Sequence, residues 1–449
     1  MDGEPSFRRF LSVVIAFLGS MVTLIFINTL FGALIGWDGL GITSFLLVIY
    51  FKNRKSLSRG MVTALTNRLG DAFLLVLLGL AFLPITATYV LLVLLLLTAI
   101  TKSAQYPFSS WLPAAMAAPT PVRALVHSST LVTAGVYLLL RFNHNGTEWL
   151  LAFGSITMLL AGLCACTEKD IKKIVALRTL SQLGVMMVGI GLALKSLRFF
   201  HLLTHAMFKA LLFLCVGVGI HTVFGTQDKR RYSSVTTVLP LPRALLSVGV
   251  MALRGVPFLA GFYRKDAILE SFYSASQRLF LYVIFLYGVG LTAAYGFGLI
   301  LGLGKSARHP LPATLNGGGT PPSVKGPLLA LGLGAILGGY LLAPFLSLGG
   351  GIIAEADKLF PLVIILKGMV LHRGIKYEKL PHLRRLWGLN PSYQHLAATG
   401  VGLRTASLVD AGAGEALIGP GWLGLFIGSQ LSFYPVLTLA LLATLLAFV

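Results

Sequence analysis

The chain has 449 residues, enough for two or three soluble domains, but its composition excludes them. Hydrophobic residues make up 56% and charged residues only 11%, whereas soluble domains are about one quarter charged. The net charge of +21 would suit a nucleic-acid-binding protein, but a chain this apolar has no soluble basic face to offer. Three cysteines exclude a disulfide framework. Most of the chain is therefore expected to lie in a lipid bilayer.

Apolar windows of membrane-spanning length recur along the whole chain. A helix crosses the hydrocarbon core with about 20 such residues. The first window is long enough to be a true span, and no signal-peptide cleavage pattern precedes it. The thirteen expected spans are 10–28, 30–51, 62–83, 89–117, 121–141, 149–166, 171–194, 197–224, 240–275, 279–303, 327–347, 359–372 and 431–449.

The basic residues of the connecting loops divide unequally between the two sides of the membrane. With thirteen alternating spans, twenty lysines and arginines lie on the side of the N-terminus and five on the other. Because cytoplasmic loops collect lysine and arginine, we expect the N-terminus and the loop at 373–385 to face the cytoplasm or the mitochondrial matrix. The segment 386–430 is only moderately hydrophobic, so it is expected either to lie along the membrane plane or to form a plain loop.

Ionisable residues inside the expected spans are the main functional signal. Such residues are costly in a bilayer and face a bundle interior or a water-filled path. Their number favours a relay for a proton or another ion over a purely structural membrane protein. They are Asp38, Asp71, Lys102, His127, Arg178, His201, His205, Lys209, Arg254, Lys265 and Asp266.

Lys102 lies five residues before Pro107, within the long span 89–117. A proline inside a helix frees a backbone carbonyl, which in a membrane must find a partner or line a cavity. A lysine at such a break can carry a proton reversibly, because burial disfavours its charged form and a nearby carboxylate favours it. The alternative for Lys102 is a side chain that extends to the membrane interface. Asp38 has an alternative of its own, a carboxylate held near the interface by the glycine-rich turn around it.

The span 240–275 repeats this arrangement. Pro257 interrupts it, and Lys265 and Asp266 follow. Matched interrupted helices in two halves of a chain are typical of transporters built from repeats.

His201, His205 and Lys209 are spaced four residues apart, so they form one stripe along about two helical turns. Histidine titrates near neutral pH and can pass protons. Metal binding and interhelical hydrogen bonding are alternatives, and His127 on a neighbouring span could link Lys102 to the stripe. The sequence shows no nucleotide-binding glycine motif, no metal-ligand set and no redox cofactor site.

Several stretches resemble mitochondrial NADH dehydrogenase subunit 5, the distal antiporter-like subunit family of respiratory complex I. The matching stretches are 37–45, 103–121, 127–135, 170–177, 179–184, 201–213 and 257–263. The resemblance implies an all-α polytopic membrane protein with two inverted five-helix repeats, broken helices and a lateral helix. It divides the chain into a first half (1–141), a second half (142–303) and C-terminal spans (304–449), with the lateral helix at about 400–430.

The resemblance also implies roles for individual residues. Asp38 and Lys102 would form the first half-channel pair, with His127 as connecting residue. His201, His205 and Lys209 would form the central relay, and Lys265 would be the exit lysine beside Asp266. The implied function is proton translocation in NADH:ubiquinone oxidoreductase, with an Mrp-type Na⁺/H⁺ antiporter subunit and an inert scaffold as alternatives.

The implied setting is the mitochondrial inner membrane, with the other membrane-arm subunits of complex I and the lipid bilayer as partners. No nucleic acid partner is expected. NAD, FMN, iron–sulfur clusters and ubiquinone would be bound by other subunits, and no cofactor or metal by this chain.

The sequence departs from the family in two respects. The family has about three further spans before 10–28, so we expect either a split gene, with a separate piece supplying those spans, or a coding segment upstream. Arginine also stands where the family has serine or another small residue, at Arg123, Arg178, Arg254 and Arg264. Codons AGA or AGG, read as serine in many invertebrate mitochondria, would explain these arginines, and genuine divergence is the alternative.

Overall fold

The computed structural model describes residues 7–81, 88–126, 130–142, 148–222, 227–229, 239–256, 259–261, 268–269, 271–272, 279–304, 322–342, 363 and 367–368. They all fall in one unit, Met1–Asn390. Their regular structure is helical, beside one isolated antiparallel bridge between Asp170 and Asp228. The expected lateral segment 386–430 and the last span, 431–449, lie outside the described residues, as does nearly all of 359–372.

The described helices follow the expected spans closely. Eight of them are long and apolar enough to cross a membrane, so the protein is a multi-pass, all-helical membrane protein. The expected span 121–141 is covered by two helices on either side of residues 127–129, which lie outside the described part of the chain. In chain order the helices are α1 (Phe7–Phe26), α2 (Leu30–Val48), α3 (Arg54–Ala81), α4 (Thr88–Lys102), α5 (Trp111–Ala114), η1 (Ala115–Ala117), α6 (Thr120–Leu125), α7 (Leu131–Phe142), α8 (Glu148–Thr167), α9 (Ile171–Gly191), α10 (Lys195–Thr222), α12 (Pro240–Arg254), α14 (Leu279–Gly304) and α15 (Pro322–Leu342).

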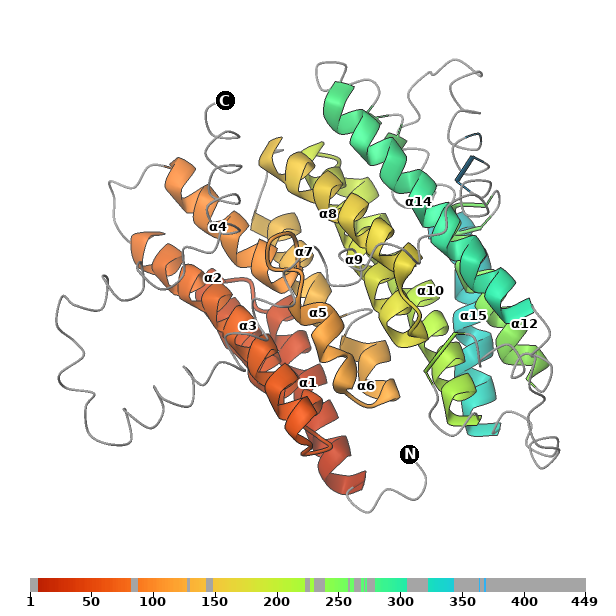
Figure 1. Ribbon diagram of the computed structural model, residues 1–449. Coiled ribbons are helices and arrows are strands. Elements are labelled where there is room, and N and C mark those ends of the chain that lie inside the picture. Colours follow the sequence, from red (N-terminus) through yellow and green to blue (C-terminus); the bar gives the residue numbers. More distant parts are fainter. Residues whose placement is uncertain are drawn as a thin grey trace, which may run out of the picture. The chain divides into compact units, whose positions relative to one another are not determined.

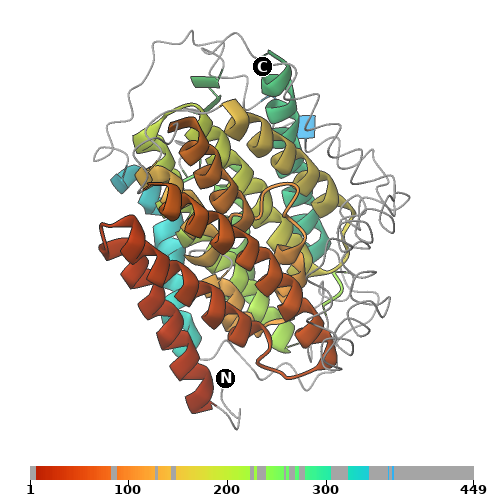
Figure 2. The same ribbon diagram turned by 90° about the vertical axis from the view of Figure 1, so that its left-hand side faces the viewer.

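Helix α9 is the most deeply buried of the spanning helices. All of its hydrophobic window lies inside the bundle, whereas only 22% of the α1 window does. Helix α9 packs closely against α8, which in turn packs against α14, and α10 packs against α12 and α15 (Figure 1). Helices α1 and α2 pack together, as do α3 and α4, and Figure 2 shows these helices running side by side from a second direction. Helix α9 therefore lies at the centre of the described bundle, and its polar side chains, Arg178 among them, are buried with it.

Glycines allow the closest helix crossings. A Cβ atom on Gly154 of α8 would lie 2.7 Å from the carbonyl oxygen of Gly184 on α9. A Cβ on Gly135 of α7 would lie 2.6 Å from the carbonyl oxygen of Ala99 on α4. Because lipid tails are as apolar as the helices, packing between membrane helices depends on such close approach of small residues. These crossings therefore set how closely α8 lies against α9, and α7 against α4.

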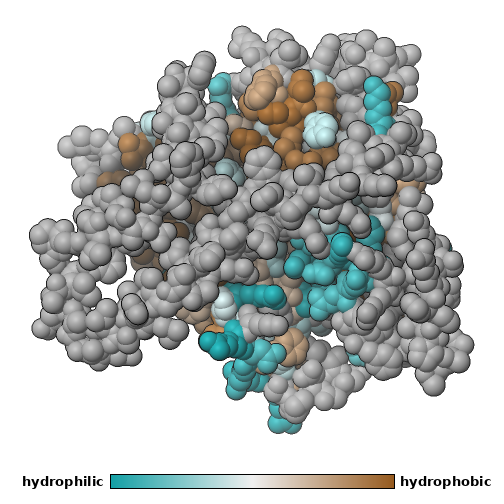
Figure 3. All heavy atoms as spheres, in the orientation of Figure 1, coloured by the Kyte–Doolittle hydropathy of each residue, from teal (hydrophilic) through white to brown (hydrophobic). Residues whose placement is uncertain are grey.

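The described surface is divided by polarity. In the view of Figure 3, most described hydrophilic side chains lie in the lower part of the face, with a group of hydrophobic side chains above them. A membrane protein is expected to show this division, because charged loops lie in the aqueous and headgroup regions and apolar side chains in the hydrocarbon.

Both helices that were expected to be interrupted end before their proline. Helix α4 ends at Lys102, five residues before Pro107, and α12 ends at Arg254, three residues before Pro257. Gly255 then adopts the left-handed conformation (φ 82°), and the N–H of Val256 donates to the Met251 carbonyl, which ends the helix in a Schellman arrangement.

Two of the four arginines that were expected to replace a smaller residue lie deep in the bundle. Arg178 and Arg254 are almost completely buried. Arg178 donates from Nη2 to the Tyr295 carbonyl at 2.9 Å, but its Nε and Nη1 atoms have no hydrogen-bond partner among the described residues. A serine would avoid a buried cation at this position. Arg123 is also buried, and Arg264 lies outside the described residues.

We therefore predict AGA or AGG codons at positions 123, 178, 254 and 264, and serine at these positions in the protein isolated from its organism. Sequencing of the gene gives the codons, and mass spectrometry of peptides from the purified protein gives the residues. Codons of the CGN type, or peptides carrying arginine, would show instead that the arginines are genuine.

Candidate functional site

The interruption after α4 positions the first candidate residue, Lys102. Ala104 is left-handed (φ 55°), and the N–H of Gln105 donates to the Ile100 carbonyl at 3.1 Å, so the helix ends in a Schellman-type turn. The Trp111 indole N–H donates to the Thr101 carbonyl at 3.0 Å. Two carbonyls freed by the end of the helix are thus satisfied locally, as burial in a membrane requires.

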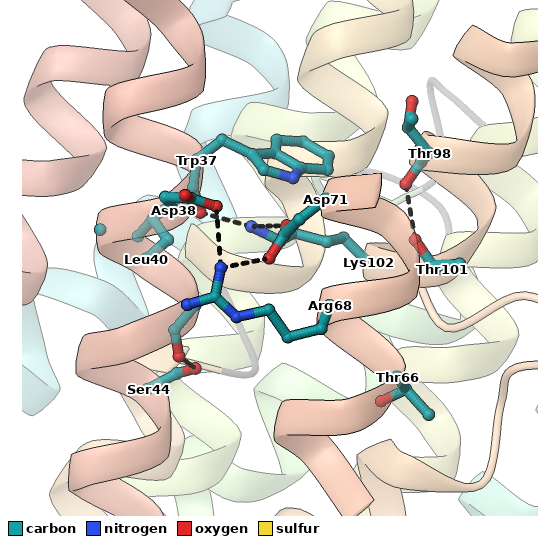
Figure 4. A network of polar contacts seen from close by, with 12 residues as sticks. Trp37, Asp38, Leu40, Ser44, Thr66, Arg68, Asp71, Thr98, Thr101 and Lys102 are labelled. Atoms are coloured by element: carbon teal, nitrogen blue, oxygen red, sulfur yellow. Dashed lines mark hydrogen bonds and ion pairs between the residues drawn. The ribbon is translucent and has the colours of Figure 1, made fainter. Parts of the chain in front are cut away.

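Lys102 is fully buried, and three groups surround its ammonium. Its Nζ atom donates to the Trp37 carbonyl at 2.5 Å and lies 4.0 Å from the centre of the Trp37 indole. An oxygen of the Asp71 carboxylate lies 3.8 Å away. Figure 4 shows the ammonium between α2, which carries Trp37, and α3, which carries Asp71. A hydrogen bond, a ring face and a carboxylate together compensate for the loss of water around the charge.

Arg68 extends this ion pair outward. Its Nη1 atom lies 3.5 Å from the Asp71 carboxylate and 3.6 Å from the Asp38 carboxylate. The four charges alternate in sign along the path from Asp38 to Lys102 (Figure 4). Side-chain exposure decreases from 57% at Arg68 and 37% at Asp38 to 8% at Asp71 and zero at Lys102. The network therefore joins an accessible carboxylate to a buried ammonium. We call these four residues the charge network.

The expected pairing of Asp38 with Lys102 is therefore indirect. The ion pair of Lys102 is with Asp71, and that of Asp38 is with Arg68. The reason is helical geometry, because Trp37 and Asp38 are consecutive residues of α2 and point about 100° apart. Since Trp37 packs against Lys102, Asp38 is directed toward Arg68.

Sequence reasoning missed Arg68 and gave Asp71 no role beyond an ionisable residue in a span. The available signal was their spacing of three residues, which places opposite charges on one face of an otherwise apolar helix.

The second candidate group is the stripe on α10. His201, His205 and Lys209 are all buried, and the two imidazole rings have their centroids 6.2 Å apart. The Lys209 Nζ atom donates to the Val175 carbonyl of α9 at 2.6 Å and lies 5.4 Å from the ring of Phe213. The stripe therefore lies inside the bundle, against its most buried helix.

Three further candidates, His127, Lys265 and Asp266, lie outside the described residues. Within the described part of the chain, no group of three or more His, Cys, Asp or Glu residues could hold a metal ion. The described groups can hold, donate and accept protons. They are the lysine and two carboxylates of the charge network, and the two imidazoles and the lysine of the stripe on α10.

A family model, described as the membrane part of NADH:quinone oxidoreductase and Mrp antiporters, matches residues 28–292. Among curated relatives, NADH-ubiquinone oxidoreductase chain 5 of Anopheles quadrimaculatus is 47% identical over 335 residues, which cover 69% of this chain and 58% of the relative. The chain thus spans less than two thirds of that relative's length. The corresponding protein of Artemia franciscana is 42% identical over 84% of this chain and 71% of its own length.

Two solved structures share the fold. A chain of the Mrp complex from Dietzia sp. DQ12-45-1b matches with a TM-score of 0.67 and 25% identity, over 97% of this chain and 51% of that one. A chain of respiratory complex I from Thermus thermophilus with bound aureothin matches with a TM-score of 0.64 and 23% identity, over 75% of this chain and 80% of that one. This chain therefore belongs to the NADH:quinone oxidoreductase/Mrp antiporter membrane family and, within it, to the NADH-ubiquinone oxidoreductase chain 5 group.

Proposed function

We propose that this chain is a proton-translocating membrane subunit of respiratory NADH:ubiquinone oxidoreductase. The observation that carries the proposal is the buried Lys102 ammonium, held at a helix interruption by Asp71 and joined through Arg68 to the more accessible Asp38. Such an arrangement is costly in a membrane, and ionisable residues that are kept there typically mark an ion or proton path. The similarity to chain 5 subunits over most of this chain supports the same conclusion.

The charge network suggests how a proton could be moved. Burial disfavours the charged form of a lysine, whereas a neighbouring carboxylate favours it. The distance between Lys102 and Asp71 therefore decides whether Lys102 keeps its proton. In this scheme, a small displacement of α3 relative to the end of α4 opens the pair and releases the proton toward the stripe on α10. Closing the pair allows Lys102 to be protonated again.

The remaining expectations complete this proposal. Residues 1–141 and 142–303 would form two inverted halves, each with an interrupted helix, followed by C-terminal spans and a lateral helix at about 400–430. His127 would connect Lys102 to the stripe, and Lys265 with Asp266 would form the exit. The chain would lie in the mitochondrial inner membrane with its N-terminus on the matrix side, among the other membrane-arm subunits. NAD, FMN, iron–sulfur clusters and ubiquinone would be bound by those other subunits.

A second candidate function is that of a subunit in an Mrp-type cation/proton antiporter. It is favoured by the match to the Mrp complex structure, which covers 97% of this chain. Purification from native membranes separates the two. A complex I subunit is expected to co-purify with flavin and NADH-oxidising activity, and an antiporter subunit without either.

Replacing Lys102 by methionine keeps most of the side-chain volume and removes the proton carrier. We expect NADH-driven electron transfer to continue, while the number of protons pumped per electron falls, because losing a positioned proton-transfer group slows its step by about 10²-fold or more. Proton uptake and NADH oxidation are measured together in sealed vesicles containing the assembled complex. The matched control is Lys325→Met, which removes an exposed lysine of α15. Equal pumping in the Lys102 variant and the control would reject the proposal.

The two carboxylates of the network should differ in importance. Asp71→Asn leaves Lys102 buried without its partner, and breaking a buried pair costs about 3–5 kcal/mol. Asp38→Asn removes a half-exposed pair worth about 0–1 kcal/mol. We therefore expect much less chain in the assembled complex for Asp71→Asn than for Asp38→Asn, as measured by native gel and by thermal unfolding. The opposite order would show that Lys102 depends on Asp38 instead.

A further inference from the structure

A polar link joins the interruption at Lys102 to a helix of the second half. On the side of the interruption the link begins at Gln105, which is completely buried three residues after Lys102. Its backbone N–H donates to the Ile100 carbonyl at 3.1 Å, and its side-chain Nε2 donates to the Ser103 carbonyl at 3.2 Å. Both bonds return to the last turn of α4 and the turn after it. The Gln105 side chain is therefore fixed to the end of the helix that carries Lys102.

On the other side, Thr157 of α8 provides the partner. Its hydroxyl lies 2.6 Å from Gln105 Oε1 and 2.9 Å from the Gly154 carbonyl of its own helix. Both Gln105 and Thr157 are withdrawn from solvent, with relative exposures of 0% and 1%. A buried side-chain amide without its partner would cost free energy, so this hydrogen bond favours one relative position of the two segments.

Thr157 itself lies at the tightest part of the α8–α9 crossing. A Cβ atom on Gly184 would lie 2.6 Å from the Gly154 carbonyl oxygen and 2.8 Å from the Thr157 hydroxyl. The backbones of α8 and α9 thus touch where the hydroxyl projects. This crossing consequently sets the position of Thr157. The hydrogen bond from Thr157 to Gln105 connects that position to the end of α4.

We propose that Gln105 and Thr157 are positioning residues, through which the α8–α9 pair sets the place of Lys102 relative to Asp71. The inference deepens the proposed function and rests on it. A displacement of α8 pulls on the turn that ends at Gln105, and Lys102 lies three residues before Gln105, at the end of α4. The Lys102–Asp71 distance of 3.8 Å changes with that displacement, and so does the readiness of Lys102 to exchange its proton.

The test compares substitutions on α8 in the assembled complex. Thr157→Val keeps the shape and removes the hydroxyl, whereas Thr157→Ser keeps the hydroxyl. The control is Ser155→Ala, because Ser155 is equally buried but its hydroxyl donates to the Ala152 carbonyl of its own helix. Proton pumping per electron is measured in sealed vesicles across a range of pH.

We expect Thr157→Val to move the pH profile of pumping and to lower pumping at neutral pH by about threefold to tenfold, the change that corresponds to one buried hydrogen bond. Thr157→Ser should restore the original profile, and Ser155→Ala should not alter it. If the valine variant does not assemble, Gln105→Met removes the same bond from the other side and is expected to shift the profile in the same way.

Two outcomes would overturn the inference. One is an unchanged pH profile of pumping in Thr157→Val, or in Gln105→Met where that variant is used instead. The other is a shift of the pH profile in Ser155→Ala that equals the shift in Thr157→Val. Lys102→Met is measured alongside to separate this failure from that of the proposed function. If Lys102→Met lowers pumping and the profile of Thr157→Val does not move, only the positioning role is rejected. If Lys102→Met also leaves pumping unchanged, the proton path through Lys102 is rejected as a whole.

Discussion

The arrangement of α2, α3 and α4 depends on keeping one charged lysine inside an apolar bundle. An ammonium without water is unstable there unless hydrogen bonds and an opposite charge replace its hydration. Lys102 obtains both, from the Trp37 carbonyl and ring and from Asp71. Asp71 in turn lies beside Arg68, which also contacts the more accessible Asp38. The requirements of a single buried charge therefore account for the polar side chains that α2 and α3 direct toward the end of α4.

The helix interruption makes this charge available at the right depth. A continuous helix would hold every carbonyl in its own hydrogen-bond ladder. By ending at Lys102, α4 frees carbonyls that Gln105 and Trp111 then satisfy. Gly135 allows α7 to approach the end of α4 closely, at Ala99 and Ser103. Local backbone geometry and helix packing thus determine the position of the ammonium, and the chemistry follows from that position.

Much of this was predictable from the sequence, and the remainder has identifiable physical reasons. Apolar windows predicted the described spans, and prolines predicted that α4 and α12 end where they do, because these signals act within a few residues. The stripe of His201, His205 and Lys209 followed from helical spacing alone. The partner of Lys102 did not, since choosing Asp71 over Asp38 requires knowing how α2 and α3 rotate against α4. Arg68 was missed although its spacing of three residues from Asp71 was visible in the sequence. The contact between Gln105 and Thr157 could not be foreseen, because it joins residues 52 positions apart.

The most direct measurement is the interaction between Lys102 and Asp71 in a double-mutant cycle. Thermal unfolding of the assembled complex is compared for Lys102→Met, Asp71→Asn and the variant with both changes. If the two groups stabilise each other as a buried pair, the double variant, which has neither charge, will be more stable than Asp71→Asn alone, and the two effects will not add. Simple addition of the two losses would contradict the account, because it would mean that the ammonium and the carboxylate do not depend on each other.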